Sequence, residues 1–206
     1  RTLRTWRPDL LILIDFPDFN LRVAKTAQAL KIPILYYICP QVWAWRKGRV
    51  RLFEKLIDQL AVILPFEEAF WRKNGVKATY VGHPLMDQPE FNPNRSLKRV
   101  DFGPSMVGLL PGSRKKQLVM HLPIIVAAAK ELSQKDSSLK FCVALLGKRH
   151  EQWVKDYLAA VDMGSLFEVT TQGARVLFPK CDLVIAASGT VTLEAALAKV
   201  PTVVVY

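Results

Sequence analysis

Apolar and polar positions follow two alternating patterns along the chain. Short apolar runs predict buried β-strands, and longer stretches with an apolar residue at every third or fourth position predict amphipathic helices. The predicted strands cover residues 9–14, 34–38, 61–64, 78–81, 106–110, 139–145, 183–186 and 202–206. The predicted helices cover residues 21–30, 47–60, 67–73, 115–133, 151–160 and 191–199. Strands that alternate with helices form parallel sheets with helices on both faces, so we predict an α/β fold.

One proline-rich interval interrupts this alternation. Residues 84–104 include Pro84, Pro89, Pro93 and Pro104 among residues of mixed charge, which is typical of a linker. We therefore predict two Rossmann-like domains, at residues 1–87 and 104–206, joined by a linker at 88–103. The chain starts with a basic segment and stops inside its last predicted strand, so we expect both domains to be incomplete parts of a longer protein.

Composition narrows the class of protein. The 206 residues are 50% apolar and 23% charged, which excludes a disordered tail. No apolar run approaches the roughly 18 residues of a membrane-spanning helix, and the basic N-terminal segment lacks the apolar core of a signal peptide. Cys39, Cys142 and Cys181 are too widely spaced for a disulfide framework or a zinc site, and they favour a reducing, cytoplasmic setting. The three histidines show no metal-ligand spacing, so the sequence predicts no metal site.

The net charge of +11 is concentrated in the first half of the chain. Arg46, Lys47 and Arg49 follow directly on Trp43 and Trp45, and such a segment attracts polyanions in general. Indole rings beside cations suit the interface of an anionic membrane. They equally suit single-stranded nucleic acid, through stacking and phosphate contacts. A third interpretation is that the tryptophans pack against the sheet beside a solvated basic face.

Asp15 is the first candidate for chemistry. It ends the apolar run of residues 9–14, which places its carboxylate at the carboxyl end of a parallel strand, where open α/β sheets bind their ligands. A carboxylate there could act as a general base toward a hydroxyl. The alternative is a structural hydrogen bond in the loop. Asp18 or Asn20 is predicted to cap the helix that follows.

A second candidate follows the strand at residues 106–110. Gly112, Ser113 and Arg114 form a short turn before a predicted helix, and a helix N-terminus favours anions through its free N–H groups and its dipole. The Arg114 guanidinium adds a fork that suits phosphate. The spacing is not that of a Walker motif, and a plain strand–helix turn remains the alternative.

A third candidate repeats this arrangement after the strand at residues 183–186. Ser188, Gly189 and Thr190 could surround a diphosphate, and Glu194 lies about one turn further along the predicted helix. Its carboxylate could accept hydrogen bonds from a ribose diol. An ordinary Ser/Thr cap followed by an acidic residue would give the same pattern.

Six segments together resemble the lipid-A-disaccharide synthase family. They are IDFPDFN (14–20), PQVWAWRKGRV (40–50), LPFE (64–67), VGHPL (81–85), LLPGSR (109–114) and ASGTVTLEAAL (187–197). The first two are specific to that family, whereas the last is shared with other sugar-nucleotide transferases. The glycine-rich G-E-x-S-G-D loop with which family members begin is absent from this chain.

The resemblance implies a GT-B glycosyltransferase with two Rossmann-like domains and an active site between them. Family members transfer 2,3-diacylglucosamine from UDP to 2,3-diacylglucosamine 1-phosphate (lipid X). They form a β-1′,6 linkage with inversion and without a metal or other cofactor. They act peripherally at the cytoplasmic face of the inner membrane of Gram-negative bacteria, so we expect an anionic membrane surface, and not nucleic acid, as a partner.

The resemblance also implies roles for individual residues. It makes Asp15 the base for the 6-hydroxyl of the acceptor and Glu194 the acidic residue at the ribose. It makes Arg114 a phosphate-contacting residue and places Ser188, Gly189 and Thr190 at the diphosphate. Gly112 and Ser113 are predicted to bind substrate from the turn that they form before the helix. Contacts of residues 43–49 with the membrane or the acceptor are our own inference and not a known role of the family motif. We expect this chain alone to be inactive. The alternatives are the peptidoglycan precursor transferase, a UDP-N-acetylglucosamine epimerase, a basic nucleic-acid-binding module, or a non-catalytic relative that keeps UDP binding.

Overall fold

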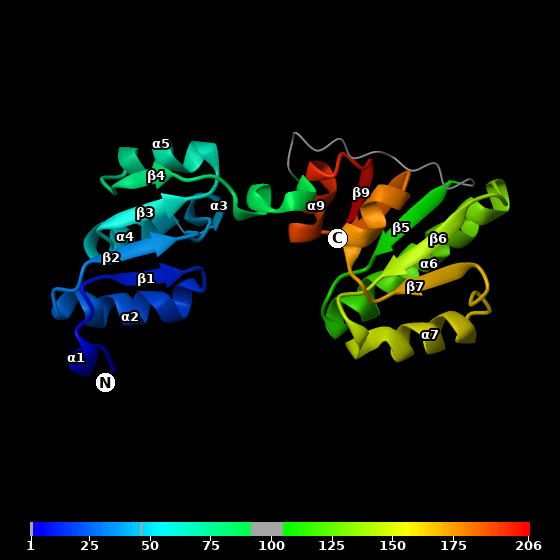
Figure 1. The fold of residues 1–206 in the computed structure, drawn as a ribbon, viewed down its shortest axis with the longest axis horizontal. Helices are drawn as coiled ribbons and strands as arrows, with labels where there is room; N and C mark the ends of the chain where they lie inside the picture. The colour runs from blue at the N-terminus through cyan, green and yellow to red at the C-terminus, as the bar shows by residue number, and fades with distance from the viewer. Residues whose placement is uncertain (1, 46, 92–104) are drawn as a thin grey trace. The chain divides into compact units, whose positions relative to one another are not determined.

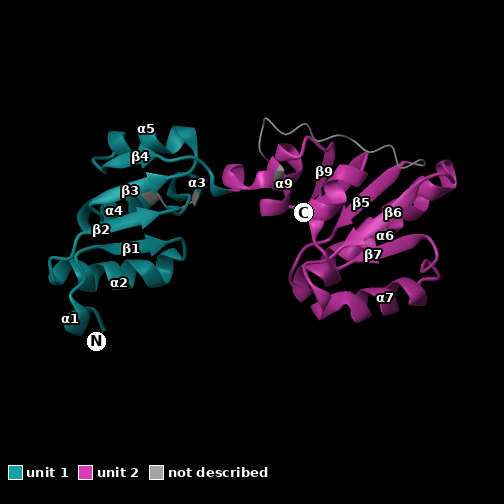
Figure 2. Cartoon of the chain, in the orientation of Figure 1, with its two compact units in different colours: residues 1–84 teal, residues 85–206 magenta. Residues whose placement is uncertain are grey.

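The computed structural model describes residues 2–45, 47–91 and 105–206 (Figure 1). The chain forms two compact units, Arg1–Pro84 and Leu85–Tyr206 (Figure 2). Leu85 and Phe91 pack against the apolar core of the second unit, so that unit takes in residues that the sequence interpretation gave to the first domain and the linker. Most of the predicted linker, at 92–103, lies outside the described residues, as does Arg46.

The first unit is built on a parallel sheet in the order β1-β2-β3-β4. Its strands are β1 (Leu11–Ile14), β2 (Ile34–Tyr37), β3 (Gln59–Val62) and β4 (Ala78–Tyr80). The helical elements are α1 (Thr2–Trp6), α2 (Pro17–Ala29), α3 (Val42–Trp45), η1 (Lys47–Arg49), α4 (Val50–Leu56) and α5 (Pro65–Lys73).

A single apolar core fills the space between one face of this sheet and helices α2, α4 and α5. Alternate strand residues such as Leu13, Ile34 and Leu60 contribute to it, as the two-residue period of a strand requires. On the opposite face of β1, Ile12 and Ile14 are exposed. The prediction of helices on both faces is therefore not met in the described part of the first unit.

Several element boundaries in this unit differ from the prediction, among them that of the strand predicted at 61–64, which covers Gln59–Val62. The helix predicted at 47–60 ends at Leu56, because Ile57 has an extended backbone and Leu60 belongs to β3. Both residues are nevertheless buried, as the apolar spacing indicated. Helix α2 begins at Pro17 rather than at residue 21, because proline suits the first helical position, where no N–H bond is needed.

The second unit is built on a parallel sheet in the order β7-β6-β5-β8-β9. Its strands are β5 (Met106–Leu110), β6 (Lys140–Ala144), β7 (Phe167–Thr170), β8 (Leu183–Ala187) and β9 (Thr202–Val205). Its α-helices are α6 (Lys115–Lys135), α7 (Glu151–Ala160), α8 (Ala174–Leu177) and α9 (Thr190–Leu197). Short 3₁₀ turns are η2 (Pro84–Asp87), η3 (Pro89–Phe91), η4 (Lys148–His150) and η5 (Phe178–Lys180).

Both faces of this second sheet are covered. Leu109 lies in a core shared with α6 and α7, and its neighbour Leu110 lies in a core shared with residues of α8 and α9. Burial on both faces explains why β5 and β8 are almost continuously apolar. The prediction of helices on both faces is confirmed here.

The order of the strands creates a switch point in the second sheet. From β5 the chain moves outward through β6 and β7, and it then returns to place β8 and β9 on the other side of β5. The loops that follow β5 and β8 therefore leave neighbouring strands at the same edge and lead to opposite faces. Such a point is where open α/β sheets bind ligands.

The three cysteines are free and buried. Burial raises the pKa of the Cys39 and Cys181 thiols to about 12 and that of Cys142 to about 11. Among the described residues, no helix is both long and apolar enough to cross a membrane. The same residues include no group of three or more His, Cys, Asp or Glu side chains arranged to hold a metal ion.

Candidate functional site

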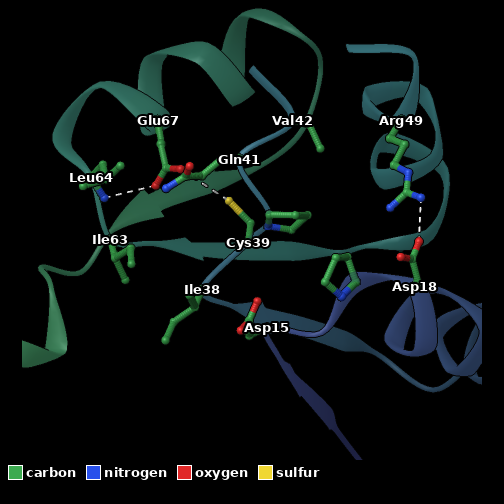
Figure 3. A pocket seen from close by; sticks show the side chains of 12 residues that line it. Asp15, Asp18, Ile38, Cys39, Gln41, Val42, Arg49, Ile63, Leu64 and Glu67 are labelled. Atoms are coloured by element: carbon green, nitrogen blue, oxygen red, sulfur yellow. Dashed lines mark hydrogen bonds and ion pairs between the residues drawn. The ribbon is translucent and has the colours of Figure 1, made fainter. Parts of the chain in front are cut away.

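A cavity of about 450 Å³ opens at the carboxyl ends of β1, β2 and β3 in the first unit (Figure 3). All three strands run parallel, so the loops that follow them meet at one edge of the sheet. The lining residues that matter for its chemistry are Asp15, Asp18, Cys39, Gln41, Arg49, Leu64 and Glu67.

Asp15 reaches this cavity from a tight turn in the left-handed region, where its φ is 47° and that of Phe16 is 40°. Three hydrogen bonds hold the turn. The Asn20 amide donates to the carbonyl oxygens of Ile14 at 2.9 Å and Asp15 at 2.7 Å. The Tyr36 hydroxyl donates to the same Asp15 oxygen at 2.5 Å, and burial raises the Tyr36 pKa to about 12, which keeps this donor protonated. Non-glycine residues with positive φ are costly and concentrate at functional sites.

The Asp15 side chain is exposed, and no hydrogen bond to its carboxylate is formed within the described residues. The turn is thus held through the backbone carbonyl, which leaves the carboxylate available to a ligand. The expected place of Asp15 at a strand end is confirmed, and its role as a base stays a prediction. The prediction that Asp18 or Asn20 caps α2 is wrong, because both lie inside the helix and Phe16 is its N-cap residue.

Glu67 forms the opposite wall of the cavity and is only 1% exposed. Its Oε2 accepts the Leu64 backbone N–H at 3.0 Å, and its Oε1 accepts the Trp43 indole N–H at 3.1 Å. The Cys39 sulfur lies 3.9 Å from the same Oε1 and accepts the Trp71 indole N–H at 3.1 Å. Burial and, secondarily, the Glu67 charge raise the Cys39 pKa, so the thiol stays neutral. This network fixes the segment after β2 against α5.

The basic tryptophan segment is partly tied into this wall. Trp43 is half-buried and packs edge-on against Phe66 of helix α5 with ring centroids 5.0 Å apart, whereas the packing interpretation expected a contact with the sheet. Arg49 makes an ion pair of 2.5 Å with Asp18 at the cavity, and its side chain is 25% exposed. Trp45 lies in α3 and Lys47 in η1. Contacts of this segment with membrane or acceptor stay predictions.

In the second unit, the loop after β5 is fixed before α6 begins. Gly112 has a φ of 111°, and an added Cβ would lie 2.8 Å from the Gln117 Cβ, so glycine is required there. The Gln117 Oε1 accepts the Arg114 backbone N–H at 3.3 Å. The side chains of Ser113 and Arg114 are exposed at the start of the helix.

The loop after β8 also leads from a strand end into the N-terminus of a helix, although other contacts hold it. The Ser188 N–H donates to the Val205 carbonyl at 3.0 Å, which anchors the loop on β9. The Thr192 hydroxyl donates to the Gly189 carbonyl at 2.8 Å, while Gly189 and Thr190 are exposed. Because β5 and β8 are neighbours, the N-termini of α6 and α9 face the same edge of the sheet. This pair of turns is suited to an anionic ligand, and their role in binding stays a prediction.

Glu194 lies beside the second turn and has a partner that the sequence did not reveal. Arg175 Nε and Nη2 donate to its Oε1 at 3.1 and 2.8 Å. The Glu194 side chain is 16% exposed, and the Arg175 side chain is 35% exposed. Arg175 follows β7 in the short helix α8, and neither element was predicted, so no sequence signal marked it.

These features define the class of protein. Two Rossmann-like parallel sheets carry their candidate ligand sites at the carboxyl ends of the strands, which is the α/β architecture of the GT-B type. The crystal structure of UDP-GlcNAc 2-epimerase from Neisseria meningitidis bound to UDP-GlcNAc has a similar fold, with a TM-score of 0.65 and 15% identity. The match covers 98% of this chain and 61% of that chain.

The family follows from the sequence comparisons. A family model described as lipid-A-disaccharide synthetase matches residues 1–206, and the chain belongs to this family. It is 41% identical to the lipid-A-disaccharide synthase of Syntrophus aciditrophicus and 43% identical to that of Geobacter metallireducens. Each match covers 100% of this chain and, respectively, 55% and 54% of the relative, so the chain spans about half the length of these curated relatives. The resemblance drawn from the six motifs is confirmed.

Proposed function

We propose that the full-length protein is an inverting glycosyltransferase of lipid A biosynthesis that transfers 2,3-diacylglucosamine from UDP to lipid X. The observation that carries this proposal is the family match over the whole chain, joined with an available carboxylate at the cavity of the first unit. A relationship to UDP-GlcNAc 2-epimerases rests on the fold alone, and the family match gives no support to a nucleic-acid-binding module.

Asp15 is the base in this proposal. Its carboxylate takes the proton from the 6-hydroxyl of the acceptor while the hydroxyl oxygen attacks the anomeric carbon of the donor. The bond from that carbon to the UDP oxygen breaks on the opposite side, which inverts the centre and gives a β-1′,6 linkage. The hydrogen bonds from Asn20 and Tyr36 support this role, because they fix the backbone from which the carboxylate projects.

The donor is proposed to bind at the switch point of the second sheet. UDP leaves with negative charge on its terminal phosphate, and a transfer without metal needs cations and N–H groups to stabilise that charge. The turns at Gly112–Arg114 and Ser188–Thr190 supply both, with the exposed Arg114 guanidinium as the cation. The Glu194 carboxylate is proposed to accept hydrogen bonds from the ribose.

The acceptor side is proposed to lie at the cavity of the first unit. Asp15 and Arg49 line the same cavity, so we propose Arg49 as a cation for the phosphate of lipid X. The charge of the basic tryptophan segment also suits an anionic membrane surface, so we propose a peripheral location at the cytoplasmic face of the inner membrane.

Product analysis tests the proposal. The full-length protein is incubated with UDP-2,3-diacylglucosamine and lipid X in detergent micelles containing EDTA, and the products are followed by mass spectrometry and NMR. We expect a tetraacylated disaccharide 1-phosphate with a β-anomeric signal. An epimerised UDP-sugar, or no disaccharide at all, would overturn the assignment, and a strict need for added metal would overturn the metal-independent mechanism.

A further inference from the structure

Arg175 joins Glu194 to the first residues of the second unit. Besides its two hydrogen bonds to Glu194, its Nη1 donates to the Gln88 side-chain oxygen at 3.2 Å. Its guanidinium carbon also lies 5.4 Å from the centre of the Phe91 ring, within the range of a cation–π contact. Three N–H groups and one face of the guanidinium are thus engaged by three side chains, of which Gln88 and Phe91 lie in the segment before β5 and Glu194 lies in α9.

We propose that Arg175 is a positioning residue of the donor site, which holds Glu194 in the orientation that binds the ribose hydroxyls. The inference rests on the proposed function, because it takes the β8–α9 turn as the nucleotide site.

The hydrogen bonds from Arg175 occupy only one of the two carboxylate oxygens of Glu194. Both Arg175 donors meet the same oxygen, Oε1. A carboxylate can accept hydrogen bonds on both oxygens, so Oε2 keeps its capacity for a ligand while Oε1 fixes the rotamer. A hydrogen bond to a charged acceptor is roughly twice as strong as a neutral one, and the low exposure of Glu194 limits competition by water.

The nature of the cation matters as well. A guanidinium is planar and presents its donors in a rigid fork, whereas a lysine ammonium is a point charge on a flexible stem. The fork places two donors on Glu194 and a third on Gln88 from three separate nitrogens in one plane, whereas the donors of an ammonium all leave a single nitrogen. The contact with Phe91 holds the plane of the fork from one side. Arg175 is therefore itself fixed before it fixes Glu194.

The test compares two nucleotides that differ only at the ribose. Binding of UDP and of 2′,3′-dideoxy-UDP to the full-length protein is measured by isothermal titration calorimetry. We expect Arg175→Gln to weaken UDP binding about tenfold, because a well-placed hydrogen bond to a charged group is lost. We expect it to weaken binding of the dideoxy nucleotide less than about twofold, because that ligand has no hydroxyl for Glu194 to bind.

Two further variants sharpen the comparison. Arg175→Lys keeps the charge without the fork, so its affinity for UDP should lie between that of the unmodified protein and that of Arg175→Gln. If Arg175→Gln does not fold, Arg175→Lys is used instead to compare UDP with 2′,3′-dideoxy-UDP. Lys155→Gln removes a cation that pairs with Glu151 at 2.7 Å elsewhere in the same unit, and it should bind both nucleotides as the unmodified protein does.

The possible outcomes distinguish the positioning role of Arg175 from the proposed function of the protein. Equal weakening of both nucleotides by Arg175→Gln, or weakening of neither, would overturn the positioning role while leaving the nucleotide site in place. Failure of the unmodified protein to bind UDP would instead overturn the proposed function on which the inference rests.

Discussion

Replacing Asn20 by alanine tests how the Asp15 carboxylate is held. The Asn20 side chain is 8% exposed, and its amide donates to two consecutive carbonyl oxygens at the end of β1. Those carbonyls bracket the point where the chain enters the left-handed region at Asp15. Without the amide, the Tyr36 hydroxyl is the remaining side-chain donor to the Asp15 oxygen among the described residues.

The size of the effect follows from these contacts. Each net hydrogen bond is worth about 1 kcal/mol, and a buried carbonyl left without a donor costs about 1–3 kcal/mol. We therefore expect Asn20→Ala to lower the free energy of unfolding by about 2–3 kcal/mol. A displacement of about 1 Å at a reacting group can cost about 100-fold in rate, so we expect kcat of the full-length protein to fall by that factor while the KM for the donor changes little.

A matched control separates positioning from stability. Asn74 is exposed at the end of α5, and its amide donates to the Phe70 carbonyl at 2.8 Å, away from the cavity. Asn74→Ala should cost less than about 1 kcal/mol and leave kcat unchanged. Urea unfolding and steady-state rates are measured for both variants below the unfolding transition. A folded Asn20→Ala protein with unchanged kcat would refute the positioning of Asp15 by this side chain.

Two further predictions concern buried groups. Glu67→Gln leaves one acceptor oxygen for two half-buried N–H donors, so it should destabilise the protein by about 1–3 kcal/mol in urea unfolding. Glu54 is exposed on α4, and the control Glu54→Gln should change stability by less than about 0.5 kcal/mol. Equal urea midpoints for the two variants would contradict the network. Folding raises the pKa of Tyr36 from 10.0 to about 12, and it raises the pKa of the three buried cysteines from 9.0 to about 11 or 12. A group whose pKa is raised on folding stabilises the folded protein while it is protonated in both states. The contribution of these four groups is therefore complete below about pH 9 and is lost as the pH rises toward 12. Urea midpoints measured from pH 8 to pH 11 should therefore decrease, and a constant midpoint would show that these groups are not buried as described.

The sequence predicts the fold class and most strands because burial leaves a direct trace in the apolar pattern. Strand β7 was missed since its short FEVT run includes a charged residue, Glu168, which an edge strand can direct to solvent. The helix predicted at 47–60 was too long because Leu60 satisfies both a helical spacing and the alternation of β3. In both cases the pairing of distant strands, which local sequence does not encode, decided the outcome.

The candidate site was predictable where it depends on position along the chain. Asp15 directly follows β1, and Arg114 lies in the turn between β5 and α6, so both can be located from the apolar run before them. The partners that orient the site were not predictable. Asn20 looked like a cap, and Arg175 had no visible link to Glu194, because these contacts depend on how helices settle on the sheet.

Acceptor-dependent release of UDP by the full-length protein and by its Asp15→Asn variant tests the central claim most directly. UDP is measured from UDP-2,3-diacylglucosamine in micelles, with and without lipid X, and binding of UDP is measured in parallel. We predict release only with lipid X, a rate for Asp15→Asn that is lower by about 10²–10⁴-fold, and unchanged UDP binding, as expected when a general base is lost. Release without acceptor, or an Asp15→Asn variant that turns over at the original rate, would contradict the account.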